Sequence, residues 1–138
     1  MVSAFLAKRT YYSPGLLDGQ DPGYAGIMVK LFGRDTLTAD GPAKLAGIQN
    51  YPILSIFIHE DRPYHYVVEA LPPIRPYTSD TPLSKEEKKR IVYDVTQQLN
   101  DRLEAHIRKY PDEWFWLHNR WKWTKRYKEK QKLKEQQN

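Results

Sequence analysis

The 138-residue chain lacks cysteine entirely, which excludes a disulfide framework and any catalysis or metal binding by thiols. It also lacks a Walker phosphate loop, a Gly-x-Ser-x-Gly nucleophile elbow and the ligand spacing of zinc sites. No apolar run approaches the roughly 20 residues that a membrane-spanning helix needs. Residues 1–9 are too short, and too basic at their end, for a secretory signal. We therefore expect an intracellular protein, either soluble or bound at a surface.

Positive charge is concentrated at the C-terminal end of the sequence. Residues 118–138 contain eight Lys or Arg and two Glu, a balance of +6. The rest of the chain has fourteen basic and fifteen acidic residues, a balance of −1. A basic patch interleaved with aromatic residues suits anionic partners such as phospholipid head groups, phosphorylated sugars or nucleic acid. For the residues after Lys125, a solvated basic tail without a partner is the alternative.

The first half of the chain predicts a helix, a strand and a second helix. Residues 1–12 place apolar side chains at helical spacing and predict a short helix. Residues 27–32 predict a buried strand that Gly33 closes. Asp40 is a candidate N-cap for a helix in which Pro42 takes an early position.

A β-hairpin is predicted in the middle of the chain. Residues 51–58 are apolar on both faces, as in a central strand that is covered on two sides. Residues 64–70 are rich in aromatic and β-branched side chains and predict an antiparallel partner strand. His59-Glu60-Asp61 lies between them and could suggest a metal site. Adjacent turn residues rarely converge on one ion, so a solvated turn is the favoured interpretation.

A long amphipathic helix is predicted after the proline-rich residues 72–82. Ser84 and Glu87 have the spacing of a capping box, and Tyr110 before a proline should end the helix. One apolar stripe follows the helical period: Ile91, Val92, Val95, Leu99, Leu103 and Ile107. The predicted fold class is therefore α/β: a small mixed sheet with a hairpin, flanked by a long helix and a short Trp-rich C-terminal helix. We expect one domain over residues 1–122 and a basic, frayed tail over residues 123–138.

Residues 111–122 concentrate three of the four tryptophans and predict that short helix. Proline at its start and two acids in its first turn favour a helix N-terminus. A Trp-rich amphipathic helix is often a core or capping element, and it can also be a binding site. The segment can serve both roles if the tryptophans pack in the core while Arg120 and Lys122 face a ligand.

The same residues resemble the closing signature of the bacterial lipid A biosynthesis acyltransferases: Pro-Asp-Glu-Trp-x-Trp-x-His-x-Arg-Trp-Lys. A second block, within residues 19–46, resembles the Asp-x-Asp-x-Gly turn, apolar strand and Thr-x-x-Gly helix start of that family. The resemblance covers about residues 16–122. It departs from the family at Gly19, where the first Asp usually stands. Asp21 matches the second Asp, and it is either a site residue or a turn former.

The resemblance implies a fold like the C-terminal half of a glycerolipid acyltransferase. It implies acyl transfer from acyl carrier protein to a hydroxyl of a lipid A precursor, by a peripheral protein at the cytoplasmic face of the inner membrane. No metal and no organic cofactor are implied. Asp21, Arg120 and Lys122 would bind the substrate, the two cations holding phosphates of the precursor or of anionic phospholipid.

The family's catalytic motif, a His with an acid five positions later, does not occur here. The fifth residue after each of the four histidines is a Tyr, an Ala, a Pro or a Trp (His59, His65, His106, His118). A His without an orienting acid is a poor general base for a hydroxyl. The chain is therefore expected to be the truncated C-terminal portion of such an enzyme and inactive alone. A separate chain supplying the N-terminal half and a remnant gene stay open as explanations.

A second class of function is a non-catalytic basic and aromatic module that binds nucleic acid or an anionic membrane. Nucleic acid is the less favoured partner. The tryptophans have core-like spacing, and after Lys125 only Tyr127 interrupts the basic residues as an aromatic.

Overall fold

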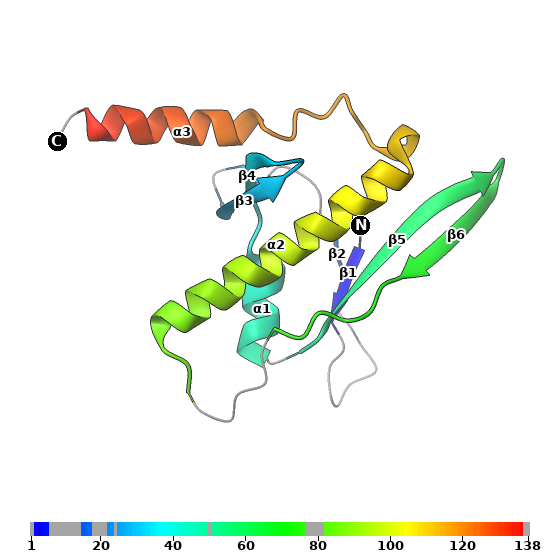
Figure 1. Cartoon of the computed structure of the whole chain (residues 1–138), viewed down its shortest axis with the longest axis horizontal. Coiled ribbons are helices and arrows are strands. Elements are labelled where there is room, and N and C mark those ends of the chain that lie inside the picture. Colours follow the sequence, from blue (N-terminus) through cyan, green and yellow to red (C-terminus); the bar gives the residue numbers. More distant parts are fainter. Residues whose placement is uncertain are drawn as a thin grey trace.

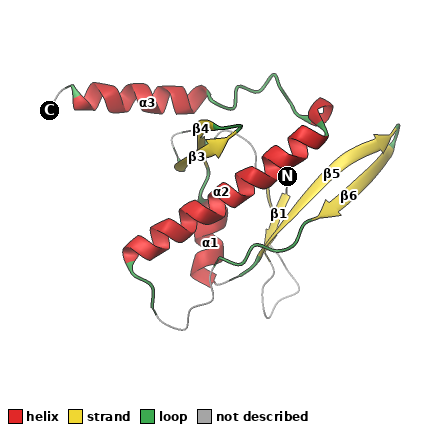
Figure 2. Cartoon of the chain, viewed as in Figure 1, coloured by secondary structure: helices red, strands yellow, loops and turns green. Residues whose placement is uncertain are grey.

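The computed structural model describes residues 2–5, 15–17, 22–23, 25–49, 51–76 and 82–136. Strands and helices are mixed along the chain (Figures 1 and 2). In chain order the elements are β1 (Val2–Phe5), β2 (Gly15–Leu17), β3 (Ile27–Leu31), β4 (Arg34–Thr38), α1 (Gly41–Gln49), β5 (Ile53–Arg62), β6 (His65–Ala70), α2 (Lys85–Lys109), the 3-10 turn η1 (Pro111–Glu113) and α3 (Lys122–Glu135). The predicted mixed α/β class is confirmed.

Two antiparallel sheets form the β structure. The larger has the strand order β2-β1-β5-β6, so β5 is a central strand, and it forms the predicted antiparallel hairpin with β6. The smaller sheet is the β3–β4 hairpin. Phe32 and Gly33 form its two-residue turn, both with positive φ, at 52° and 71°. Such a turn requires φ above zero at both positions, which glycine adopts without a steric cost.

Helix α2 contributes residues to both buried clusters of the core. Its apolar stripe contacts α1, β3 and β5 and carries two buried clusters. The first cluster joins α2 to α1 and the start of β5: Ala43, Ala46, Ile53, Ile74, Val95 and Leu99. The second joins α2 to β3 and the middle of β5: Leu31, Phe57, Leu103 and Ile107. The stripe predicted from helical spacing is therefore confirmed.

The predicted limits of α2 are also confirmed. The Ser84 hydroxyl accepts a hydrogen bond from the Glu87 backbone N–H at 3.2 Å, and the Glu87 carboxylate accepts one from the Ser84 N–H at 2.8 Å. This reciprocal pair satisfies two backbone donors at the helix start. The pair holds the pKa of Glu87 below its ordinary value. At the other end Tyr110 is the C-cap, directly before Pro111.

One local prediction in the first half is wrong, and one strand was not predicted. Residues 2–5 form strand β1, not part of a helix, and they pair with β5 over residues Ile53–Ile56. The hydrogen-bonded pairing with β5 outweighs a weak helical period in these residues. Residues 34–38, for which no strand was predicted, form β4 against β3. Confirmed predictions here are the strand from Ile27 and the helix of residues 41–49.

The Trp-rich segment differs most from its prediction. Only η1 is helical, and the chain then runs as turns and loop to α3, which begins at Lys122. Trp114 and Trp121 both pack against the second core cluster, which pins the loop at two points. The predicted helix over residues 111–122 is therefore wrong beyond Glu113. The C-terminal helix is α3 instead, and it runs to Glu135 through residues expected as a frayed tail, in a Lys-rich sequence of good helix formers.

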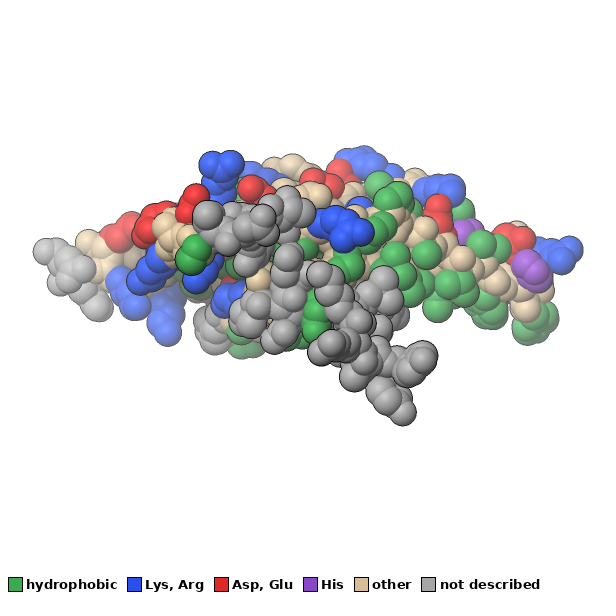
Figure 3. All heavy atoms as spheres, turned by 90° about the horizontal axis from the view of Figure 1, so that it is seen from below, with side chains coloured by type: hydrophobic (Ala, Val, Ile, Leu, Met, Phe, Trp, Pro, Cys, Tyr) green, Lys and Arg blue, Asp and Glu red, His purple; other side chains and the backbone are tan. Residues whose placement is uncertain are grey.

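The surface is unevenly divided between apolar and basic residues. Figure 3 shows hydrophobic side chains along the end of the molecule formed by the β5–β6 hairpin, and Lys and Arg side chains at the α3 end. Ile58, Tyr66 and Val68 lie on one face of the hairpin and are more than half exposed. The prediction that residues 51–58 are covered on both sides is therefore wrong at Ile58. No helix in the described part of the chain is long and apolar enough to cross a bilayer.

Candidate functional site

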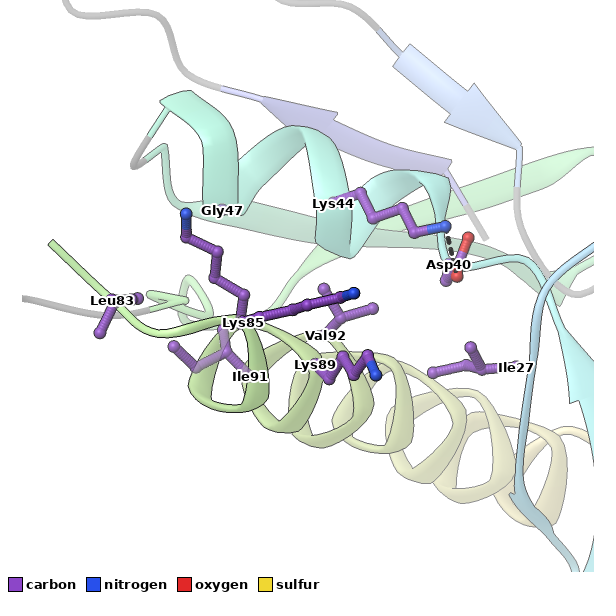
Figure 4. A pocket seen from close by; sticks show the side chains of 10 residues that line it. Ile27, Asp40, Lys44, Gly47, Leu83, Lys85, Lys89, Ile91 and Val92 are labelled. Atoms are coloured by element: carbon purple, nitrogen blue, oxygen red, sulfur yellow. Dashed lines mark ion pairs between the residues drawn. The ribbon is translucent and has the colours of Figure 1, made fainter.

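The candidate site is a cavity of about 750 Å³ between α1 and the first turns of α2. Figure 4 shows the two helices facing each other across it, with Leu83 at one end and Ile27 at the other. Its volume lies in the range of small-molecule sites, about 300–1,000 Å³. Ten residues line it: Ile27, Asp40, Lys44, Gly47, Leu83, Lys85, Lys88, Lys89, Ile91 and Val92.

Four lysines surround this cavity, and helix geometry explains why they converge. Lys85, Lys88 and Lys89 stand three and four residues apart, so they share one face of α2. Lys44 comes from α1 on the opposite side. All four side chains are exposed. The first turn of α2 also carries Glu86 and Glu87, which offset part of the positive charge of these lysines.

The interior of the cavity is apolar. Ile91 and Val92 are half-buried and pack against the first core cluster, and Ile27 and Leu83 extend this surface. The one carboxylate in the lining is Asp40, which forms an ion pair with Lys44 at 2.8 Å (Figure 4). An apolar wall with cations at its rim suits an amphiphile that has a hydrocarbon chain and an anionic head.

The titratable groups that line the cavity are four lysines and one aspartate. Its lining contains no His, Ser, Thr or Tyr that could act as a base or nucleophile, and Asp40 is already paired. Within the described residues, no group of three or more His, Cys, Asp or Glu could hold a metal ion. The reactive groups of an acyl transfer are therefore not among the residues that line this cavity.

Arg120, predicted to bind substrate, lies inside the protein and is only 1% exposed. Its guanidinium donates to the Leu37 carbonyl at 2.8 Å and to the Thr38 hydroxyl at 2.9 Å. The Thr38 hydroxyl also accepts a hydrogen bond from Asn100 of α2 at 3.1 Å. Arg120 thus joins the loop after η1 to β4 and, through Thr38, to α2. A substrate contact by Arg120 stays a prediction.

The other two predicted binding residues have different placements. Lys122 is exposed at the start of α3, with its ammonium 5.9 Å from the centre of the Trp123 ring. Asp21 lies outside the described residues. Neither Arg120 nor Lys122 lines the four-lysine cavity. The sequence-predicted set is therefore not brought together around it.

Two of the histidines, His59 and His106, stack on other aromatic rings. His59 was predicted in a solvated turn with Glu60 and Asp61, but β5 continues through it and leaves it 6% exposed. The His59 ring stacks on Tyr110 with centroids 3.9 Å apart, and the His106 ring stacks on Phe57 at 4.2 Å. Burial is the main cause that lowers the pKa of His106. His106 thus packs on Phe57 of the second cluster, and His59 packs on Tyr110, the C-cap residue of α2.

One histidine does have a carboxylate partner. His65 Nδ1 lies 2.5 Å from Asp61 Oδ1 at the tip of the β5–β6 hairpin, with both side chains 44–50% exposed. Neither of them lines the four-lysine cavity. A His–Asp pair needs a substrate held beside it to act as a general base, so this pair alone makes no active site.

Sequence reasoning missed the four lysines of the cavity. Lys88 and Lys89 lie outside the apolar stripe predicted for the long helix, and no ligand was assigned to them. Their three- and four-residue spacing from Lys85, on the face that continues into Val92, was the signal available in the sequence. Lys44 had no such signal, because only folding places α1 opposite α2.

The geometry defines a class first: an α/β protein whose surface cavity suits an anionic amphiphile. The family model for bacterial lipid A biosynthesis acyltransferase matches residues 8–123 of the chain. The chain therefore belongs to that family, which indicates a lipid A acyltransferase-like function. No curated protein and no solved structure matches it.

Proposed function

We propose that the chain holds a phosphorylated acyl lipid for the acyl transfer of lipid A assembly. In this reaction an acyl chain passes from acyl carrier protein to a hydroxyl of the lipid A precursor. The observation that carries the proposal is the four-lysine cavity with its apolar interior. The family membership supplies the reaction, and the cavity supplies a place where part of an anionic lipid fits.

The binding mode follows from the chemistry of the lining. A phosphate is held at the rim by the ammonium groups of Lys85, Lys88 and Lys89, which act as point charges with three donors each. A hydrocarbon chain lies against Ile91 and Val92. Each buried methylene contributes about 0.8 kcal/mol, so the apolar part supplies most of the affinity and the lysines select the head group.

We further propose that this chain binds without catalysing. None of the four histidines is followed by an acid at the fifth position, and no histidine lines the cavity. Binding an acceptor equally well in the ground and transition states does not accelerate the chemical step. The purified chain should therefore transfer no acyl group from labelled acyl carrier protein to a lipid A precursor. Turnover that a single His substitution abolishes would contradict this.

The direct test measures binding of monomeric dodecyl phosphate by titration calorimetry, with dodecyl maltoside as the uncharged comparison. Gly47→Leu should fill the cavity, because a Cβ at Gly47 meets no atom within 4 Å. It should also raise helix stability, since glycine in a helix costs about 0.5–1 kcal/mol. Binding that weakens about tenfold or more while the melting temperature holds or rises supports the site. Ala105→Leu, which adds a leucine to an exposed position of α2, is the matched control.

The charge arm uses Lys88→Gln together with Lys89→Gln. This double variant should weaken binding of the phosphate amphiphile and leave the uncharged one unaffected. Arg62→Gln with Arg75→Gln removes the same charge from exposed positions outside the cavity and should change neither. Equal binding by the wild-type chain and both cavity variants would show that the cavity is not the site.

A further inference from the structure

Three consecutive large apolar side chains are exposed on the loop between η1 and α3. Phe115 is 66% exposed, Trp116 58% and Leu117 89%. The loop is held in place rather than free: the Trp116 indole N–H donates to the Pro111 carbonyl at 2.7 Å. Single exposed apolar residues are common on protein surfaces, but a contiguous exposed group is typical of a binding surface. We name residues 115–117 the aromatic loop.

Helix α3 follows the aromatic loop directly and is strongly basic. Between Lys122 and Glu135 it has seven Lys or Arg and two Glu, a balance of +5 that equals the net charge of the entire chain. Two contacts fix its first half to β4: the Thr124 hydroxyl accepts the Leu37 N–H at 2.8 Å, and Lys128 pairs with Asp35. The bond from Lys128 is the largest cause that lowers the pKa of Asp35 to about 2. Figure 1 shows the second half of α3 extending past the β3–β4 hairpin.

We propose that the aromatic loop and α3 together form a docking surface for an anionic lipid bilayer. Figure 1 places the segment from η1 to α3 along one edge of the molecule, so the loop and the helix can meet the same plane. Tryptophan and phenylalanine favour the membrane–water interface, and leucine favours the hydrocarbon below it. The lysines of α3 supply the attraction to anionic head groups, about 1 kcal/mol for each Lys or Arg near the surface.

The surroundings of the aromatic rings favour a lipid bilayer over nucleic acid, the other anionic partner that a basic surface could bind. Bases bind single-stranded sites by stacking on open aromatic faces. The rings next to α3 are covered by cations instead: Arg34 lies 4.6 Å from the Trp121 ring centre, and Arg126 lies 4.8 Å from that of Trp123. In the aromatic loop the most exposed residue is Leu117, which offers no ring for stacking and is suited to a hydrocarbon. This surface is separate from the four-lysine cavity and does not depend on the function proposed for it.

The test is co-sedimentation of the full chain with vesicles of phosphatidylcholine alone or with one quarter phosphatidylglycerol. The wild-type chain should bind the anionic vesicles, lose binding as salt rises, and bind the neutral vesicles weakly. Phe115→Ser with Leu117→Ser should weaken binding about tenfold or more. Lys130→Gln with Lys134→Gln, two residues that are four apart and share one face of α3, should weaken it about fivefold for each lysine removed.

Matched controls keep the test specific to this surface. Tyr66→Ser with Val68→Ser removes two side chains of similar exposure, 62% and 64%, from the hairpin and should bind vesicles as the wild type does. Arg62→Gln with Arg75→Gln is the charge control. Circular dichroism shows that each variant is folded. Unchanged vesicle binding by either surface variant, or tighter binding to a random oligonucleotide than to vesicles, overturns the proposal.

Discussion

Replacing Arg120 separates a structural role from a substrate role for this residue. The sequence places it in a signature that implies phosphate binding, whereas the structure buries it against β4. If the main role of Arg120 is to anchor the loop after η1 to β4, Arg120→Ala should destabilise the fold. If it binds a ligand, the substitution should weaken ligand binding and leave the free energy of unfolding nearly unchanged.

The expected magnitude follows from the groups left behind. Without the guanidinium the Leu37 carbonyl loses a buried donor, and an unsatisfied buried acceptor costs about 1–3 kcal/mol. Thr38 keeps the hydrogen bond from Asn100, so its loss is smaller. The emptied volume adds to the cost, and the relief of a buried charge subtracts from it. We expect Arg120→Ala to lower the free energy of unfolding by about 2–4 kcal/mol.

The assay is urea denaturation followed by far-UV circular dichroism, with dodecyl phosphate binding measured on the same samples. Arg120→Lys keeps the charge but not the planar fork that reaches two acceptors, so it should restore only part of the stability. Thr38→Val combined with Arg120→Ala completes a double-mutant cycle, and a coupling of about 0.5–3 kcal/mol is expected between contacting groups. Lys122→Ala, at an exposed position nearby, should change stability by no more than about 0.5 kcal/mol.

A stability loss below about 0.5 kcal/mol for Arg120→Ala would refute the structural reasoning. If amphiphile binding fell in the same variant, Arg120 would be a ligand-binding residue, and the loop would have to open to admit the ligand. Weaker binding that merely tracks the unfolded fraction would support the structural role instead.

Four further predictions concern stability and association. Burial lowers the pKa of His106, so as the pH falls the unfolded chain is protonated at this histidine before the folded chain is. The free energy of unfolding should therefore fall as the pH drops through about 6.5. A denaturation midpoint that is the same at pH 7 and pH 5 would argue against this. Trp114→Ala should cost about 1–3 kcal/mol, below the 3–5 typical of a fully buried ring because the side chain is half-buried, and an unchanged urea midpoint would place the ring in solvent. Ser84→Ala should cost about 1 kcal/mol through loss of the N-cap, with thermal melting as the measurement and Ser84→Gly, expected to lose less, as the comparison. The exposed apolar face around Ile58 should promote self-association that Val68→Lys reduces, and a sharp monomer in sedimentation velocity at high concentration would count against it.

The sequence alone was sufficient for the elements whose signals are local. The capping pair of Ser84 and Glu87, the proline after Tyr110 and the four-residue repeat of apolar side chains fixed the limits and the buried face of α2. The apolar, aromatic and β-branched composition of residues 51–58 and 64–70 predicted the antiparallel β5–β6 hairpin, but not its turn, because β5 continues to Arg62. Motif register was also local information, and it led to the family that the match over residues 8–123 confirms.

Only the tertiary structure decided the rest, because the deciding partners are far apart in the chain. Residues 2–5 are a strand because β5, about fifty positions later, offers them a ladder. Trp114 and Trp121 do not lie in a helix, because both rings pack against the second core cluster. Arg120 is buried because the Leu37 carbonyl and the Thr38 hydroxyl accept its hydrogen bonds. The four-lysine cavity exists only once α1 packs on α2. Local spacing predicts which residues share a face, and long-range packing determines what that face meets.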